Sequence, residues 1–359
     1  MASAHARHLT IMADRNLRRL PLLALIGCAF VLTLTCAALA GVPSVRTVGM
    51  TVADADASAE FFERVLGFEV VSDHEVAGPA YEHLQAVFAL RMRVVRMRLG
   101  SETVELTQYL APSGRRFPED ARPNDLWFQH VAIVVSDMAR AYAHLREHRV
   151  AHASSGPQRL PESLGTAAGI EAFYFRDPDG HFLEVIAYPP GKGDPRWQDE
   201  SRLFLGIDHT AIVVADTEAS LAFYRDGLGL RLDGESENHG SEQEHLSGVF
   251  GARVRITALR GESGPGIELL EYVSPGPGRA RPTDARASDL LHWHVDLDSA
   301  DLESAAASLR QMHAALDSPG IVDVDGTLGF ARAISFADPD GHRLRFLESG
   351  SHAGANRSR

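Results

Sequence analysis

The stretch VADADASAEFFERVLGF at residues 52–68 and the stretch VADTEASLAFYRDGLGL at residues 214–230 are two copies of one motif. Each copy has an Asp suited to a helix N-terminus, then apolar residues at helical spacing, then Leu-Gly. A glycine after such a run ends a helix in a left-handed turn. A repeat of this kind predicts that the chain is assembled from copies of one supersecondary unit.

The repetition extends along most of the chain. VEL at 104–106 corresponds to IEL at 267–269, and the alternating stretches at 92–99 and 254–259 are typical of half-buried strands. A second unit follows in each half, and its copies share an apolar strand that begins with His and an Asp-Pro-Asp-Gly turn. The matching segments are HVAIVVSD (130–137) with HVDLDSAD (294–301), and FRDPDG (175–180) with FADPDG (336–341). Four units are therefore predicted, each a strand, a helix and three further strands: 45–112, 127–190, 205–275 and 290–349.

These units predict an α+β protein in which four βαβββ modules are paired into two lobes. Because neighbouring modules are expected to pair, the N-terminal lobe is predicted at 41–190 and the C-terminal lobe at 205–349. A polar segment rich in Gly and Pro, residues 191–204, is the predicted linker. Residues 350–359 are expected to form a disordered tail.

The first 40 residues have the pattern of an export signal. Three arginines between positions 15 and 19 precede an apolar run over residues 20–40, which ends in Ala-Leu-Ala. This pattern predicts a secretory signal peptide that is cleaved after Ala40. The alternatives are an uncleaved membrane anchor, since the run is long enough to span a bilayer, and a lipoprotein modified at Cys28. Cleavage would leave a periplasmic or secreted protein with no stable membrane association.

Composition narrows the chemistry of the mature protein. Both cysteines, Cys28 and Cys36, lie in the predicted signal peptide, so the mature chain would have no disulfide, thiol nucleophile or thiolate metal site. The formal net charge of −13 argues against nucleic-acid binding, which needs basic patches to neutralise phosphates. The charge does not itself identify a partner.

Two positions in every module carry residues that can bind a metal. The first-strand positions are Thr47, His130, His209 and His294, and the last-strand positions are Glu105, Glu184, Glu268 and Arg345. A carboxylate inside an apolar strand is costly to bury unless it is paired or bound to a metal. Imidazole and carboxylate together form a ligand set for Zn, Fe, Mn or Ni. The recurrence therefore predicts one divalent metal per active lobe, with identity unspecified.

Convergence of ligands follows from the predicted pairing of neighbouring modules. Glu105, His130 and Glu184 are expected to meet in the N-terminal lobe, and His209, Glu268 and His294 in the C-terminal lobe. His292 faces the same side of its strand as His294 and is an alternative ligand. Because Arg345 replaces a carboxylate, a Glu268–Arg345 ion pair without metal is the alternative for the C-terminal lobe.

The motifs resemble the vicinal oxygen chelate superfamily over nearly all of residues 45–349. The resemblance rests on His-x-x-Ile-x-Val, Phe-Tyr, Leu-Gly and Asp-Pro-Asp-Gly-His-x-Leu-Glu patterns. That superfamily includes glyoxalase I, extradiol dioxygenases, methylmalonyl-CoA epimerase and bleomycin-resistance proteins. The resemblance implies that two modules form a cup around a metal held by first and last strands.

The resemblance also implies a small-molecule substrate that chelates the metal through two neighbouring oxygens. Three candidate functions follow from it. The first is a glyoxalase-like lyase or isomerase in which a ligand Glu acts as base, and the candidate bases are Glu105, Glu184 and Glu268. The second is an extradiol-type dioxygenase with a His/His/Glu iron site, suggested by His209, His294 and Glu268. The third is a non-catalytic protein that sequesters a small molecule, as resistance-type relatives do.

Overall fold

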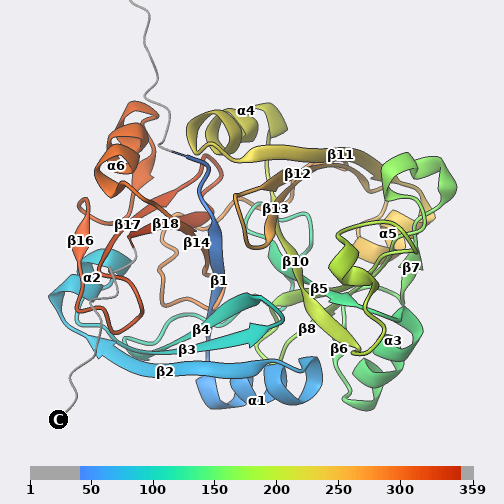
Figure 1. The fold of residues 1–359 in the computed structure, drawn as a ribbon, viewed down its shortest axis with the longest axis horizontal. Coiled ribbons are helices and arrows are strands. Elements are labelled where there is room, and N and C mark those ends of the chain that lie inside the picture. The colour runs from blue at the N-terminus through green and yellow to red at the C-terminus, as the bar shows by residue number, and fades with distance from the viewer. Residues whose placement is uncertain (1–40, 349–359) are drawn as a thin grey trace, which may run out of the picture. The chain divides into compact units, whose positions relative to one another are not determined.

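The computed structural model describes residues 41–348, and their strands form two nine-stranded mixed sheets (Figure 1). The predicted signal peptide and the predicted tail at 350–359 lie outside the described residues. No helix within residues 41–348 is long and apolar enough to cross a membrane.

Sheet A runs in the order β15-β17-β18-β14-β1-β4-β3-β2, and β16 pairs with β17. Its strands are β1 (Val45–Val52), β2 (Glu69–Ala77), β3 (Arg91–Leu99), β4 (Glu102–Ala111), β14 (Trp293–Asp298), β15 (Ala315–Leu316), β16 (Val322–Asp323), β17 (Arg332–Ala337) and β18 (Arg343–Glu348). This sheet therefore combines the first and the fourth module of the chain.

Sheet B runs in the order β11-β12-β13-β10-β5-β9-β8-β6, and β7 pairs with β8. Its strands are β5 (Gln129–Val135), β6 (Ala151–His152), β7 (Gln158–Arg159), β8 (Glu171–Arg176), β9 (Phe182–Ala187), β10 (Phe204–Val213), β11 (Arg231–His239), β12 (Arg253–Arg260) and β13 (Gly266–Ser274). This sheet combines the second and the third module.

The α+β class and the pairing of four modules into two lobes are confirmed, but the predicted choice of partners is wrong. The strand β1 pairs antiparallel with β14, and β5 pairs antiparallel with β10. The sheet-A lobe thus contains modules 45–112 and 290–349, and the sheet-B lobe contains modules 127–190 and 205–275. In every module the first strand pairs in parallel with the last strand along one edge, as β1 does with β4. Its other edge is free to pair with the first strand of another module. Because the four first strands are similar apolar sequences, the repeat alone does not say which of these edges meet.

Helices lie on both faces of the sheets (Figure 1). They are α1 (Ala55–Leu66), α2 (Pro79–Gln85), α3 (Met138–Glu147), α4 (Thr217–Leu221), α5 (Ser241–Ser247) and α6 (Leu302–Gln311), with short helical turns η1 (Glu162–Ala167), η2 (Pro195–Gln198) and η3 (Ala222–Gly227). The helices α1, α3, α4 and α6 pack on the outer faces, whereas α2 and α5 pack on the faces that carry Glu105 and Glu268. The helix α1 shows the predicted signals at both ends. Asp54 accepts hydrogen bonds from the amides of Asp56 and Ala57, and Gly67 closes the helix at a φ of 73°.

Modules that are neighbours in the sequence share a hydrophobic core rather than a sheet. Phe62 of α1, Leu145 of α3 and Phe173 of β8 belong to one buried cluster in the N-terminal half. Tyr224 of η3 and Leu309 of α6 belong to the equivalent cluster in the C-terminal half. The halves are therefore held together through their helices and the lobes through their sheets, so the two levels of organisation interlock.

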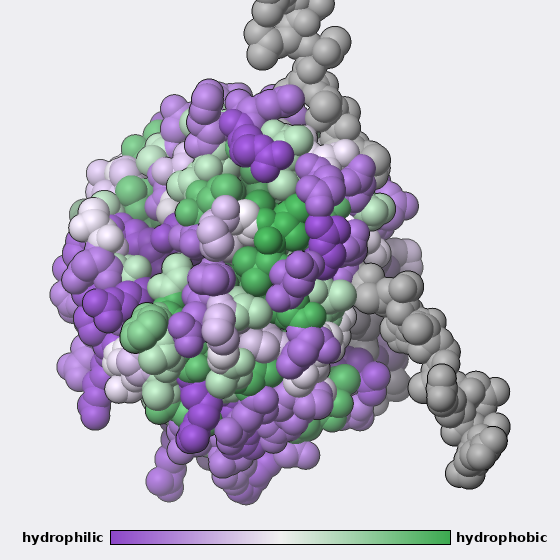
Figure 2. All heavy atoms as spheres, turned by 90° about the vertical axis from the view of Figure 1, so that its left-hand side faces the viewer, coloured by the Kyte–Doolittle hydropathy of each residue, from purple (hydrophilic) through white to green (hydrophobic). Residues whose placement is uncertain are grey.

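Two loops reinforce this interlocking through reciprocal arginines. Arg115, after β4, pairs with Asp284 and Asp289, and Arg279, after β13, pairs with Asp120 and Asp125. Bidentate contacts of this kind fix geometry as well as adding energy. Figure 2, which views the side of α2, α6 and β16, shows a mainly hydrophilic surface on which hydrophobic residues gather near the middle and are scattered elsewhere.

Candidate metal centre

Sheet B brings four of the predicted side chains to one place. They come from the first and last strands of its two modules: His130 on β5, Glu184 on β9, His209 on β10 and Glu268 on β13. Strand register explains the convergence. Ala132 is the pairing partner of both Glu184 and His209, and Ala211 is the partner of both His130 and Glu268. Paired residues point to the same face of a sheet, so all four side chains share one face around two small alanines.

The four side chains form a continuous series of contacts from His130 through Glu184 and His209 to Glu268. His130 Nε2 lies 3.0 Å from Glu184 Oε2. His209 Nε2 lies 3.6 Å from Glu184 Oε2 and 3.3 Å from Glu268 Oε2. Ligand atoms of His130, Glu184 and His209 all lie within 4.8 Å of one another, and all three residues are buried. The Glu268 side chain is 22% exposed and closes the cluster on its open side.

Burial and mutual contact shift the pKa of every member. Burial lowers the pKa of His130. Burial alone would raise the pKa of Glu184, but hydrogen bonds from His130 and His209 lower it to about 2. Burial opposes the charged form of His209, yet the carboxylates of Glu268, Asp208 and Glu184 raise its pKa well above the ordinary value. Burial raises the pKa of Glu268. The cluster is an anionic site that favours a positive charge at its centre.

The donor set fits a divalent cation. The buried ring of His130 contacts Glu184 through Nε2, and its Nδ1 has no hydrogen-bond partner among residues 41–348. Within the same residues, no Arg or Lys forms an ion pair with Glu184 or Glu268, whose ionic contacts are with His130 and His209. Two imidazoles and two carboxylates form a ligand set for Zn, Fe, Mn or Ni, and two carboxylates match the charge of a divalent ion.

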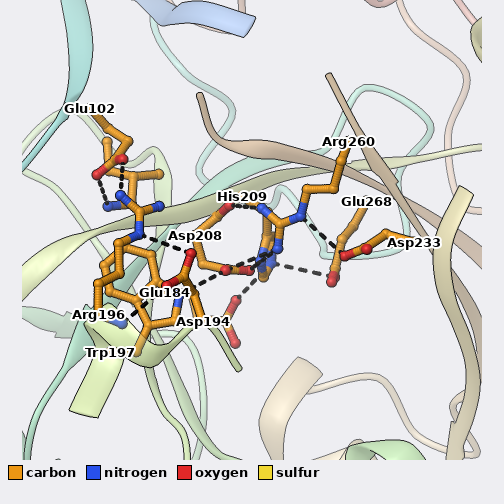
Figure 3. A network of polar contacts seen from close by, with 11 residues as sticks. Glu102, Glu184, Asp194, Arg196, Trp197, Asp208, His209, Asp233, Arg260 and Glu268 are labelled. Atoms are coloured by element: carbon orange, nitrogen blue, oxygen red, sulfur yellow. Dashed lines mark hydrogen bonds and ion pairs between the residues drawn. The ribbon is translucent and has the colours of Figure 1, made fainter. Parts of the chain in front are cut away.

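Asp208 holds His209 in place from behind (Figure 3). Its Oδ2 lies 2.9 Å from His209 Nδ1, which fixes the ring and leaves Nε2 facing the cluster. Arg260 donates to both carboxylate oxygens of Asp208 at 3.0 and 3.1 Å, and Trp197 Nε1 donates to Oδ1 at 3.1 Å. The predicted linker therefore supplies Trp197, which is 4% exposed, to the support of the site. Sequence reasoning assigned no role to Asp208, although it directly precedes His209.

A cavity of about 100 Å³ lies against the cluster and is lined by Glu184, His209 and Glu268. Its walls include three tyrosines and several aliphatic side chains, with Tyr174, Tyr188 and Tyr272 among them. A larger, more polar hollow of about 640 Å³ shares Tyr188 and Glu268 with this cavity. The inner space is small compared with the roughly 300–1,000 Å³ of pockets for drug-sized ligands. It suits a small ligand that enters past Glu268.

Sheet A places the equivalent residues in a different arrangement. They are Thr47 on β1, Glu105 on β4, His294 on β14 and Arg345 on β18. Thr47 Oγ1 donates to the carbonyl of Thr103. The guanidinium of Arg345, which is 1% exposed, lies 3.1 Å from Glu105 Oε1 and 2.7 Å from His294 Nε2. A fixed cation thus occupies the centre of this cup.

Two smaller changes accompany Arg345. Asp296 stands where sheet B has Ala132, and its carboxylate accepts from Arg345 Nε at 2.7 Å and Nη2 at 2.8 Å. Gly49 stands where sheet B has Ala211, and the His294 ring lies so close that a Cβ at Gly49 would come within 2.0 Å of it. Burial opposes the charge of Glu105, but Arg345, His294 and Arg96 hold its pKa well below the ordinary value. The charges of this cup are balanced by protein groups alone.

The predicted ligand sets are therefore regrouped. The structure does not bring Glu105 to His130 and Glu184, and it does not bring His294 or His292 to His209 and Glu268, because those residues belong to different sheets. The alternative ion pair between Glu268 and Arg345 is also wrong, since Arg345 contacts Glu105 and Asp296. The wrong pairing of modules caused all three errors. The metal-binding and catalytic roles themselves stay predictions.

Comparison with known proteins places the chain among related folds. The family model described as Glyoxalase/Bleomycin resistance protein/Dioxygenase superfamily matches residues 44–185 and 206–346. Glyoxalase I from Zea mays is similar in structure, with a TM-score of 0.57, 14% identity, and coverage of 85% of this chain and 92% of that chain. A mutant of the Zea mays enzyme gives the same TM-score and coverage at 15% identity. At these identities the likeness concerns the fold alone.

One relative is similar in sequence. A 2-epi-5-epi-valiolone epimerase from an Actinomyces species is 33% identical over 168 residues, which are 46% of this chain and 89% of that protein. The aligned length is thus close to half of the present chain.

Proposed function

Because the chain belongs to the Glyoxalase/Bleomycin resistance protein/Dioxygenase superfamily, we propose that it is a divalent-metal-dependent isomerase or lyase that moves a proton on a carbon next to a carbonyl group. One observation carries the proposal. His130, Glu184, His209 and Glu268 converge in the sheet-B lobe, and no Arg or Lys among residues 41–348 neutralises the two carboxylates. We place one metal per chain in this lobe and none in the sheet-A lobe, where Arg345 supplies the cation.

The exposure of each side chain and its place in the cavity suggest its role. A divalent ion held by these four side chains would polarise a substrate carbonyl and favour loss of a proton from the adjacent carbon. Glu268 is the proposed base, because its side chain is 22% exposed and lines both the inner cavity and the outer hollow. Glu184, 6% exposed and held by two imidazoles, keeps the site together. The tyrosine-lined wall excludes water around the transferred proton.

Relatives support an isomerase more than other activities, since the similar Actinomyces protein is an epimerase. A dioxygenase is the second candidate. It is favoured by the tight cluster of His130, Glu184 and His209, because two imidazoles and one carboxylate form the triad of non-haem iron oxygenases. Against it, Glu268 contacts His209 and would take a position that the triad leaves open.

Deuterium exchange tests the proposal and separates the candidates. The metal-reconstituted protein is incubated in D2O with small α-hydroxyketones, and exchange at the carbon next to the carbonyl is followed by NMR. Exchange in the wild type and its loss in Glu268→Gln, with metal retained, is the expected result. Oxygen uptake with catechols that persists in Glu268→Gln would favour the dioxygenase. Tight binding without exchange or oxygen uptake would favour a sequestering protein.

Export remains a proposal based on the N-terminal segment. The arginines at positions 15–19 and the apolar run to Ala40 lead us to propose a periplasmic or secreted protein that begins at Gly41. Mass spectrometry of the protein isolated from its native cells should find Gly41 or a near neighbour at the N-terminus. An intact Met1 would contradict export with cleavage.

A further inference from the structure

Two buried amide side chains face the cavity beside the metal cluster. Asn238, on β11, is 4% exposed, and Gln243, on α5, is 3% exposed. Both line the cavity that contains Glu184, His209 and Glu268. The side-chain oxygens Asn238 Oδ1 and Gln243 Oε1 have no hydrogen-bond partner among residues 41–348.

An amide oxygen that is buried without a partner destabilises the folded protein. Such groups are rare in native structures, and their retention calls for a ligand or a water that satisfies them. An amide end also presents a donor beside its acceptor, so its natural complement is a group that both donates and accepts. A hydroxyl group meets this requirement.

The sheet-A lobe provides an internal comparison. Counting from the glycines that precede α2 and α5, Val76 is equivalent to Asn238 and Tyr81 is equivalent to Gln243. Val76 and Tyr81 lie in a hydrophobic cluster with Phe330, and the Tyr81 hydroxyl donates to Asp325. The lobe whose centre is filled by Arg345 thus has apolar packing where the metal-competent lobe has amides. Because both lobes share the fold, the fold itself does not require amide side chains at these two positions.

The charge of the cavity narrows the ligand further. No Arg or Lys is among the described residues that line the inner cavity. A divalent ion would balance Glu184 and Glu268, which leaves no excess positive charge for a phosphate or carboxylate group on the ligand. The part of the ligand that fills the inner cavity is therefore neutral.

Building on the proposed function, we propose that Asn238 and Gln243 determine specificity for a neutral, polyhydroxylated ketone. A divalent ion held by the cluster would bind the carbonyl and a neighbouring hydroxyl of the substrate, while the remaining hydroxyl groups of the substrate bond to the two amides. A ketone that has the chelating pair but lacks the other hydroxyls leaves both amides unsatisfied and binds more weakly.

Two probe ketones isolate this interaction. 2-Hydroxycyclohexanone has a six-membered ring and the chelating pair alone, whereas an inosose has the same ring and pair with four further hydroxyls. Affinity for each is measured by calorimetry on the metal-reconstituted wild type and on Asn238→Val and Gln243→Leu. Gln85→Leu, which removes a buried amide at the end of α2 in the other lobe, is the matched control.

The wild type should bind the inosose at least about tenfold more tightly than 2-hydroxycyclohexanone. Each amide variant should lose most of that preference while keeping its metal content, and its melting temperature without ligand should stay equal or rise. The control should keep the preference. A wild type without preference, a wild type that binds neither ketone, or amide variants with lower melting temperatures and equal losses for both ketones would overturn the inference.

Exchange measured on the same samples keeps the two proposals separate. Preference for the inosose without exchange at carbon would end the proposed isomerase and leave the specificity inference standing. Equal exchange and equal binding of the two ketones would support the isomerase and overturn the inference.

Discussion

In the sheet-B lobe, two first strands and two last strands place two imidazoles and two carboxylates around one point. In the sheet-A lobe, the same four strand positions place a hydroxyl, an imidazole, a carboxylate and a guanidinium around the equivalent point. Asp296 under Arg345 replaces the Ala132 of sheet B. The comparison teaches that a cup of this fold buries carboxylates and needs a cation. We propose that the sheet-B lobe takes its cation from solution as a metal ion, whereas the sheet-A lobe has a cation in its own Arg345 side chain.

Removing one buried carboxylate from each lobe should give the largest difference between the two lobes in metal binding. Glu184→Gln in sheet B should weaken metal binding by more than about 100-fold. Mutating a residue that only holds a metal ligand in place already costs about 10–100-fold in affinity, and Glu184 is itself a proposed ligand. Activity should fall with the metal. Glu105→Gln, which removes the buried last-strand carboxylate of sheet A, should leave metal content unchanged. Metal analysis after dialysis checks both variants, and loss of metal in Glu105→Gln would show that the sheet-A lobe also contributes to binding.

The cation of the sheet-A lobe should matter for folding. Arg345→Met leaves Glu105 and Asp296 buried without their guanidinium, so the free energy of unfolding should fall by about 3–5 kcal/mol. Urea unfolding measures this loss. Metal content of the folded variant should remain that of the wild type. A stability change below about 1 kcal/mol would mean that the ion pair contributes little.

The support of His209 should have an intermediate effect. Asp208→Asn keeps the size of the side chain but removes the charge from the hydrogen-bond partner of His209 Nδ1. Metal affinity should therefore fall by roughly 10–100-fold. Asp233→Asn is the control, because Asp233 contacts Arg260 but not the histidine. Titration with a competing chelator measures the affinity. Equal affinities in the two variants would remove Asp208 from the account.

The glycine under His294 should have the smallest effect of the set. Gly49→Ala introduces a Cβ that would lie 2.0 Å from the His294 ring, so the ring must move at a cost of about 1–3 kcal/mol. Ala211→Gly, at the equivalent position of sheet B, should cost about 0.5–1 kcal/mol through backbone entropy. Thermal unfolding compares the two. A neutral Gly49→Ala would mean that His294 has another position within reach.

Much of this arrangement could be predicted from the repeat. The motif at 52–68 and its copy at 214–230 gave the helices, and the strand patterns gave four modules with a ligand position at His130 and its equivalents. Register within a module follows from period-two alternation, so the sequence also predicts that His130 and Glu184 share a face. These inferences rest on local physics that each module repeats.

The remainder depends on contacts between modules. The four first strands, around Thr47, His130, His209 and His294, are too similar in sequence to reveal which of their edges pair. The predicted partners of Glu105 are therefore wrong. The roles of Asp208 and Asn238 depend on what lies beside them in space. Comparing equivalent positions would have found a signal in Asn238, because it stands where another module has the apolar Val76.

Counting metal ions in the chain tests the central claim most directly. The wild type and the variants His130→Ala and His294→Ala are purified without added metal, and their metal content is measured by inductively coupled plasma mass spectrometry. The account predicts about one divalent ion per chain in the wild type and in His294→Ala, and almost none in His130→Ala. Two ions per chain, or an ion that survives in His130→Ala and disappears in His294→Ala, would contradict it.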